Sequence, residues 1–142
     1  IKMKIDIVYT TKSKYIKCVA DEMAHWVKTY VHDLKDYHEN ECVDLLVIGF
    51  DDTLFEDKEL LNFIQSLNRQ KIKNVALINC FYINNKQLMK IIKLCQDQQL
   101  PLMREQYTFK MSFDQRKEIN PLIIDNARLY IEDMVNVIRN YY

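Results

Sequence analysis

The sequence predicts an α/β protein whose sheet is mostly parallel and carries helices on both faces. Apolar segments typical of strands alternate along the chain with segments of helical periodicity. Two of the strand segments are apolar almost throughout, which is typical of strands covered on both faces. The chain has 142 residues, of which 49% are hydrophobic. We therefore expect residues 1–142 to form one domain whose core needs neither a metal nor a disulfide.

The first half of the chain predicts a strand, a helix and two further strands. Residues 3–9 are rich in Ile and Val and end in a polar run, so we expect a strand. A helix is expected over residues 14–27, capped by Ser13 or Thr11. Its inner stripe has the spacing i, i+3, i+4, i+7 and i+11, with Ile16, Val19, Ala20, Met23 and Val27. A weaker, polar edge strand is expected over 28–34 and a buried strand over 42–50.

The second half continues the alternation and ends in a helix. Helices are expected over residues 56–67 and 85–98, and strands over 74–80 and 102–111. The final helix, over about residues 124–140, has an inner side formed by Ala127, Ile131, Met134, Val135 and Ile138. Strands that alternate with helices in this way imply right-handed crossovers and a parallel sheet.

The charge and glycine content exclude several classes of function. Twenty Lys and Arg balance twenty Asp and Glu, so the chain lacks the positive field of a nucleic-acid binder, and we expect no nucleic-acid partner. The longest strongly apolar run, Leu45 to Phe50, is far too short to span a membrane; we expect no membrane partner and see no signal peptide. Gly49 is the only glycine, so neither GxGxxG nor GxxxxGK[ST] is present.

The cysteines and histidines predict neither a metal site nor a catalytic centre. The four cysteines contain no CxxC pair and are expected to be reduced thiols of a cytoplasmic protein. The three histidines lack the spacing of metal ligands, and no Ser, His and Asp arrangement or GxSxG elbow is present. We therefore expect no catalytic residue.

Three segments should lie together at the carboxyl edge of the sheet, where open parallel sheets bind ligands. The first, residues 10–15, places hydroxyl and ammonium groups before a helix whose free N–H groups attract anions. A phosphate could be held by Thr10, Thr11, Lys12, Ser13, Lys14 and Tyr15. A hydroxyl-rich helix cap followed by solvated lysines explains the same residues.

The second and third segments, residues 50–56 and 81–85, place aromatic residues at strand ends. Such side chains could stack on a flat ring, although ordinary core aromatics fit equally well. The aromatic residues are Phe50, Phe55, Phe81 and Tyr82. The acids of the second segment would disfavour a ring that becomes negative on reduction; a solvated loop with a helix-capping aspartate also explains them. These acids are Asp51, Asp52, Glu56 and Asp57.

These segments resemble those of the flavodoxin-like family. IDIVY with its hydroxyl-rich turn is similar to that family's phosphate loop, and VDLLVIGF with DDTLF and NVALINC with FYINN are similar to its two ring-contacting loops. PLIIDNARLYIEDMVNVI is similar to its C-terminal helix. The resemblance implies a three-layer sandwich with a five-stranded parallel sheet of order 2-1-3-4-5. It also implies an FMN cofactor and a redox partner protein such as a reductase.

By this resemblance, the cofactor-binding residues form a phosphate turn and two ring-contacting loops. The turn comprises Thr10, Thr11, Lys12, Ser13, Lys14 and Tyr15, and the loops contain Phe50, Asp51, Asp52, Thr53, Phe55, Phe81, Tyr82 and Asn84. The family's turn usually runs S/T-x-T-G-N-T. Here Lys14 occupies the glycine position, Tyr15 the asparagine position and Ile16 that of the last threonine.

The sequence leaves three functions open. The first is an FMN-binding electron carrier, or a flavodoxin-like subunit that serves a partner reductase, in which the flavin and no side chain performs the redox chemistry. The second is a flavin-free interaction module on the same scaffold, which the missing turn glycines favour. The third is a phosphoryl receiver that uses Asp51 or Asp52, although Thr10 and Thr11 stand where such a domain has its Mg²⁺-binding acids.

Overall fold

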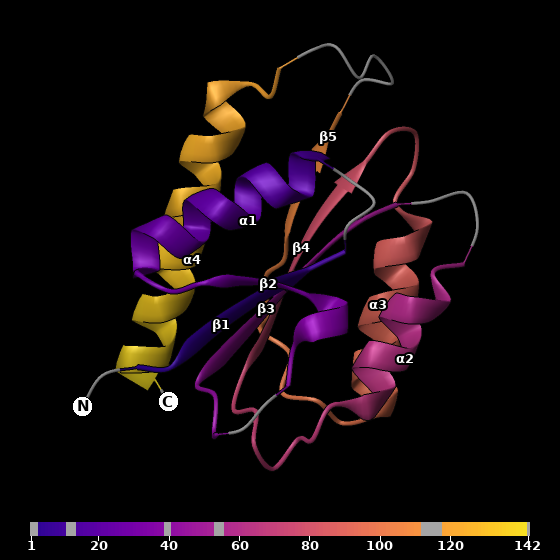
Figure 1. The fold of residues 1–142 in the computed structure, drawn as a ribbon, viewed down its shortest axis with the longest axis vertical. Helices are drawn as coiled ribbons and strands as arrows, with labels where there is room; N and C mark the ends of the chain where they lie inside the picture. Colours follow the sequence, from indigo (N-terminus) through magenta and orange to yellow (C-terminus); the bar gives the residue numbers. More distant parts are fainter. Residues whose placement is uncertain (1–2, 11–13, 39–40, 53–55, 112–117, 142) are drawn as a thin grey trace.

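The computed structural model describes residues 3–10, 14–38, 41–52, 56–111 and 118–141. Five strands form one sheet in the order β2-β1-β3-β4-β5, and each neighbouring pair is parallel (Figure 1). The strands are β1 (Ile5–Tyr9), β2 (Val31–Asp33), β3 (Leu45–Asp51), β4 (Val75–Phe81) and β5 (Tyr107–Lys110). The predicted α/β class and the predicted strand order are both confirmed.

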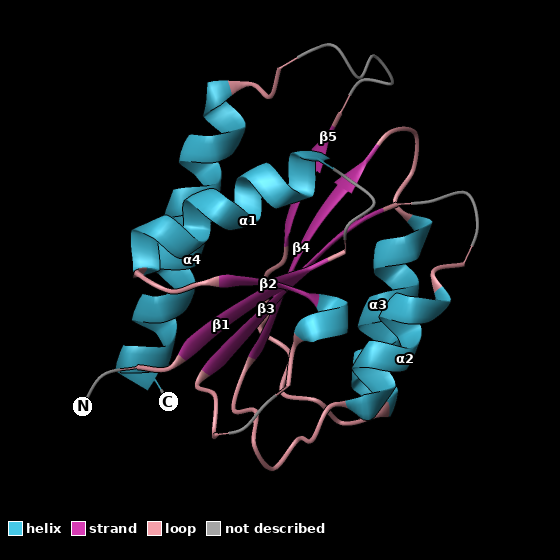
Figure 2. Cartoon of the chain, in the orientation of Figure 1, coloured by secondary structure: helices cyan, strands magenta, loops and turns pink. Residues whose placement is uncertain are grey.

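The helices cover both faces of the sheet (Figure 2). They are α1 (Lys14–Val27), α2 (Lys58–Ser66), α3 (Lys86–Asp97) and α4 (Pro121–Tyr141), with a short 3₁₀ helix η1 (Leu34–Asp36) after β2. α1 and α4 pack on one face, and α2 and α3 lie on the other (Figure 1). No helix in the described ranges is both long enough and apolar enough to cross a bilayer.

The central strand β3 separates the two cores. All seven of its residues are buried. Leu45 and Val47 face the core beneath α1 and α4, whereas Leu46, Ile48 and Phe50 face the core beneath α2 and α3. Because a fully buried aliphatic side chain contributes about 1.5–3 kcal/mol, this strand alone anchors both layers. The nearly continuous apolar run in the sequence reflects this double coverage.

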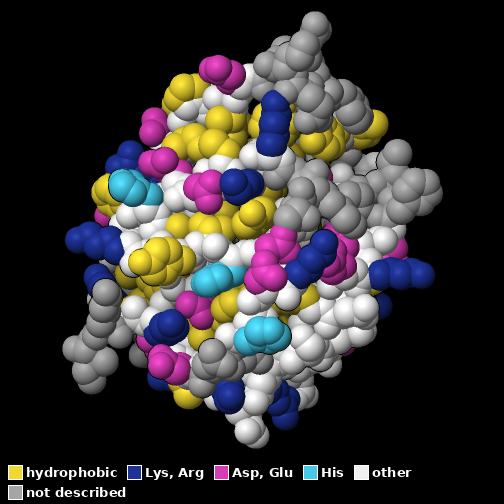
Figure 3. All heavy atoms as spheres, viewed as in Figure 1, with side chains coloured by type: hydrophobic (Ala, Val, Ile, Leu, Met, Phe, Trp, Pro, Cys, Tyr) yellow, Lys and Arg dark blue, Asp and Glu magenta, His cyan; other side chains and the backbone are white. Residues whose placement is uncertain are grey.

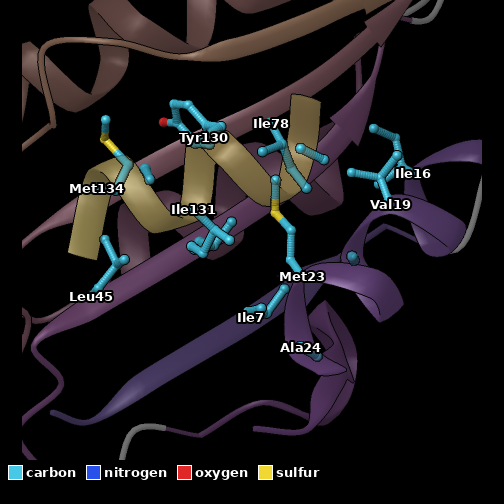
Figure 4. Packing of buried hydrophobic residues seen from close by; sticks show 14 of the residues in the cluster. Ile7, Ile16, Val19, Met23, Ala24, Leu45, Ile78, Tyr130, Ile131 and Met134 are labelled. Atoms are coloured by element: carbon cyan, nitrogen blue, oxygen red, sulfur yellow. The ribbon is translucent and has the colours of Figure 1, made fainter. Parts of the chain in front are cut away.

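The core between α1, α4 and the sheet follows the predicted helical stripes. Figure 4 shows Met23 of α1 beside Ile131 of α4, with Ile78 of β4 close to both. Met23, Ile131 and Ile78 are fully buried. Each residue predicted on the inner side of the last helix is buried as well. Val27, at the end of the first stripe, is only partly buried.

Several element boundaries differ from those expected. The predicted strand over 102–111 is limited to Tyr107–Lys110, because Leu102 and Met103 pack in the connection that precedes it and make only an isolated bridge to Val75. The last helix begins at Pro121 rather than near residue 124. Asn120 caps it, since its Oδ1 accepts a hydrogen bond from the N–H of Leu122 at 2.9 Å.

The predicted edge strand over 28–34 is also shorter than expected. α1 ends at Val27, and Lys28 takes a left-handed conformation with φ of 59°. The strand then covers only Val31–Asp33. Asp33 caps η1 by accepting a hydrogen bond from the N–H of Lys35 at 2.9 Å, which ends the strand.

Candidate functional site at the carboxyl edge of the sheet

The carboxyl ends of β1, β3 and β4 meet at one edge of the sheet (Figure 1). Backbone hydrogen bonds continue just beyond the strands: the N–H of Thr10 donates to the carbonyl of Gly49 at 3.0 Å, and the N–H of Asp52 donates to the carbonyl of Cys80 at 2.8 Å. The residues that follow these three strands are therefore held together. This is the juxtaposition on which the sequence prediction depended.

The described part of the predicted phosphate turn consists of Thr10, Lys14 and Tyr15. Thr10 is 3% exposed, and its hydroxyl has no hydrogen-bond partner among the described residues. Lys14 is exposed at the first turn of α1, with its Nζ 5.1 Å from the centre of the Tyr15 ring. Thr11, Lys12 and Ser13, which include both predicted helix caps, lie outside the described residues.

The structure corrects the prediction for Tyr15. Its side chain is 2% exposed and belongs to the core beneath α1 and α4. A ring buried at this depth has no surface to offer a phosphate, so only its backbone remains available. Tyr15 follows the first residue of α1, and the inward direction of that position outweighs its place in the turn.

The second loop contains a similar correction. Phe50 is fully buried and packs in the core beneath α2 and α3, so its side chain cannot border a ligand ring. Asp51 is 7% exposed and Asp52 is half-buried at the end of β3. Thr53 and Phe55 lie outside the described residues. Asp57 caps α2 through a hydrogen bond from the N–H of Leu60 to its Oδ1 at 3.2 Å, as the alternative interpretation of this loop expected.

Asp52 connects this loop to the first turn of α3. Burial raises the pKa of Asp52 above its ordinary value of 3.8. Hydrogen bonds from the backbone N–H groups of Gln87 and Lys86 and the charges of Lys86 and Lys90 act in the opposite direction. The carboxylate thus serves as a helix cap supplied from another part of the chain, whereas the local cap residue, Asn85, makes no side-chain cap hydrogen bond.

The third loop keeps polar and aromatic surface accessible. Phe81 and Tyr82 are half-buried at the end of β4, and Tyr82 packs against the core beneath α1 and α4. Asn84 is exposed, and its Oδ1 accepts a hydrogen bond from the N–H of Lys86 at 3.4 Å. Of the four predicted ring-contacting aromatics, these two are described and are not fully buried, and their contact with a ring stays a prediction.

Several polar atoms at this edge are buried without a hydrogen-bond partner. The atoms that have no hydrogen-bond partner among the described residues are Thr10 Oγ1, Asp52 Oδ2, Asn79 Oδ1, Asn85 Oδ1 and Gln87 Nε2. A buried polar group that lacks a partner costs about 1–3 kcal/mol, and native proteins supply nearly all such groups with a protein, water or ligand partner. Because they gather near the ends of β1, β3 and β4, this edge is the candidate site.

Sequence reasoning missed Asn79, Asn85 and Gln87. Asn79 lies within β4 and is fully buried, and its amide donates only a long hydrogen bond, of 3.5 Å, to the carbonyl of Cys80. The available signal was an amide inside the apolar segment NVALINC, where a strand covered on both faces normally carries none. Gln87 is 5% exposed although it is a polar residue in the first turn of an amphipathic helix.

Other chemistry has little support in the described residues. No group of three or more His, Cys, Asp or Glu side chains there could hold a metal ion. The four cysteines form no disulfide; burial raises the pKa of the Cys95 thiol to about 11 and that of Cys18 above its ordinary value. Thiols with such pKa values are poor nucleophiles at neutral pH.

Comparison with known proteins yields structural matches only. No family model and no curated protein matches the sequence. A flavodoxin from the domain Archaea is similar over 97% of this chain and 100% of that one, with a TM-score of 0.76 and 12% identity. A flavodoxin from Streptococcus pneumoniae TIGR4 is similar over 93% of this chain and 97% of that one, with a TM-score of 0.70 and 11% identity.

The chain has a flavodoxin-like fold. A larger protein, the rubredoxin oxygen:oxidoreductase of Desulfovibrio gigas, contains a similar region that covers 96% of this chain and 36% of that protein, with a TM-score of 0.74 and 10% identity. This chain is thus similar in fold both to whole flavodoxins and to part of a larger oxidoreductase.

Proposed function

We propose that this chain is a flavodoxin-like domain of residues 1–142 that binds FMN at the carboxyl edge and transfers electrons to or from a redox partner such as a reductase. The proposal rests on one observation: the buried polar atoms without partners gather at the edge where the resemblance to flavodoxins implies the cofactor. A polar ligand bound there would supply the hydrogen-bond partners that these atoms lack among the described residues.

The residues at this edge fit the two chemical parts of FMN. Thr10, Lys14 and the N-terminus of α1, together with the predicted Thr11, Lys12 and Ser13, would hold the phosphate through hydroxyl, ammonium and backbone N–H groups. Phe81 and Tyr82 would contact the ring, and the amides of Asn85 and Gln87 would supply hydrogen bonds at its polar rim.

When bound, the flavin would supply the one- and two-electron redox chemistry. The residues of this chain would set its environment. The carboxylates of Asp51 and Asp52 would place negative charge beside the ring, which would oppose the gain of negative charge on reduction and so lower the reduction potential. Phe81 and Tyr82 would exclude water from the ring by contact.

The proposal is tested by titrating the purified full chain with FMN and following flavin fluorescence. We expect quenching that saturates at one FMN per chain. Lys14→Glu should weaken binding by about tenfold or more, since a charge-assisted hydrogen bond contributes about 1.5–3 kcal/mol. Lys17→Glu is the matched control, because Lys17 is also exposed on α1 but lies one turn further from its N-terminus; it should change the dissociation constant by less than about threefold.

Two results would contradict the proposal. If flavin fluorescence stays unchanged at high FMN concentration, FMN is excluded as the cofactor and the flavin-free interaction module is favoured. Equal effects of Lys14→Glu and Lys17→Glu would mean that FMN binds elsewhere than at the turn before α1. The absorbance spectrum of freshly purified protein gives an independent readout, because bound flavin absorbs visible light and the protein alone does not.

A further inference from the structure

The exposed side of α3 combines lysines with uncovered apolar side chains. Lys86, Met89, Lys90 and Lys93 are all exposed, and their spacing of i, i+3, i+4 and i+7 places them along one side of the helix. Ile83, in the loop just before α3, is 71% exposed, and Met89 is 64% exposed. We name these five residues the α3 patch.

The positive charge of the α3 patch is compensated only in part within the described chain. α3 carries no acidic residue in its first turn, and its only acid, Asp97, is its last residue. Asp52, at the carboxyl edge, lies close enough for the charges of Lys86 and Lys90 to lower the pKa of its carboxyl group. Lys93 forms no ion pair with any described residue. Elsewhere the charges are mixed: Figure 3 shows acidic and basic side chains interspersed over the described residues of one face.

The placement of these lysines opposes the helix dipole. The N-terminus of a helix carries about half a positive charge, so acids in its first turn stabilise the helix and lysines there destabilise it. Lys86 is the first residue of α3 and Lys90 lies one turn later. An exposed methionine and an exposed isoleucine among them add apolar surface that contributes nothing to the folded chain. Both features are unfavourable for folding and favourable for binding an anionic, partly apolar surface.

We propose that an acidic partner protein docks on the α3 patch. Carboxylates of the partner would pair with the three lysines, and apolar side chains of the partner would cover Met89 and Ile83, whose flexible and branched side chains suit a protein contact. A nucleic acid fits less well, since the three lysines extend over only about 10 Å of helix and the chain has no net positive charge.

The patch lies beside the proposed cofactor edge, because α3 begins directly after the loop that contains Tyr82 and Asn84. A protein docked there would reach the ring site from the side of the third loop. This role as an electron-transfer partner rests on the proposed function. The docking itself does not, since the lysines and the apolar side chains of the patch are present without a cofactor.

The experiment measures binding of a fluorescein-labelled peptide composed of Glu, Asp, Leu and Phe to the full chain by fluorescence anisotropy. Lys90→Glu combined with Lys93→Glu should weaken binding by about tenfold or more, and added salt should weaken binding of the parent. Lys17→Glu combined with Arg139→Glu changes the net charge equally on the opposite face and should alter the dissociation constant by less than about twofold. Met89→Ser should also weaken binding, with no change in charge.

Three outcomes overturn the proposal: no binding of the peptide, equal losses in the two double variants, or tighter lysine-dependent binding of a single-stranded DNA oligomer or of phosphatidylserine vesicles. FMN titration of the same proteins separates the two proposals. If the peptide binds at the α3 patch and FMN does not bind, the docking surface stands and the electron-transfer function fails. If FMN binds and the peptide does not, the FMN-binding function stands and the docking surface fails. Circular dichroism of each variant confirms that it is folded.

Discussion

Replacement of Gly49 by alanine tests the close packing of α1 on the sheet. Gly49 lies within β3, where its φ is not positive, so no turn requires it. A Cβ at this position would lie 2.8 Å from Cγ2 of Ile16 and 3.1 Å from Cγ1 and Cδ1 of Ile78. Ile16 cannot move this methyl group easily, because a β-branched residue in a helix has one strongly preferred χ1 rotamer. The added methyl group therefore forces α1 away from β3 and β4.

The expected cost follows from two opposing effects. Overpacking a close-packed core costs about 1–3 kcal/mol. Alanine also restricts the unfolded chain relative to glycine, which returns about 0.5–1 kcal/mol. We expect Gly49→Ala to lower the free energy of unfolding by about 1–2 kcal/mol, and the midpoint of thermal unfolding by about 3–7 °C.

Urea unfolding followed by circular dichroism measures this cost, with the slope of the transition as a check that the unfolded state is unchanged. Ile16→Ala deletes the Cγ2 atom that the new Cβ would meet. In that background Gly49→Ala should cost less than it does alone, so the double-mutant cycle should show coupling between the two sites. A neutral or stabilising Gly49→Ala, or strict additivity with Ile16→Ala, would refute the reasoning.

Three further predictions concern other parts of the fold. Tyr37→Phe removes the hydroxyl that donates to Oδ2 of the buried Asp6 at 2.6 Å, and it should lower stability by about 1–3 kcal/mol in urea unfolding; an unchanged midpoint would contradict the importance of this bond. Ile131→Ala should cost about 2–5 kcal/mol because its side chain is fully buried, whereas Leu129→Ala, at a position 57% exposed, should change stability by less than about 0.5 kcal/mol; similar costs would mean that α4 does not pack as described. Burial raises the pKa of Tyr107 to about 12, so between its ordinary value of 10 and that value only the unfolded chain ionises, and stability should fall as the pH rises through this window; Tyr107→Phe should make the alkaline loss measurably smaller, and an identical pH profile would be inconsistent with a buried phenol.

The architecture could be predicted well because the spacing of apolar residues indicates whether each segment is a helix or a strand, and the alternation of the two indicates a layered α/β fold. The stripe from Ile16 to Val27 predicted α1 with the bounds it has, and the two uniformly apolar segments predicted central strands. The late start assigned to α4 was avoidable, since Asn120 followed by Pro121 is a capping residue followed by the residue preferred at the first helical position.

The candidate site was harder to predict because it depends on which way individual side chains point. Phe50 and Tyr15 were assigned to loops by their places in the sequence, but both faces of the sheet are covered, and their side chains are buried in the two cores. The cap that Asp52 provides for α3 joins residues more than thirty positions apart. Such a contact follows from strand order and register, which local patterns do not specify.

A nuclear magnetic resonance titration of the ¹⁵N-labelled chain with FMN tests the central claim most directly, since it reports both binding and its location. The amide signals of residues 10, 14–15, 49–52 and 79–87 should shift or broaden as FMN is added, and those of the second half of α4 should stay in place. Unchanged spectra at saturating FMN, or shifts centred on α4, would contradict a flavin site at the carboxyl edge.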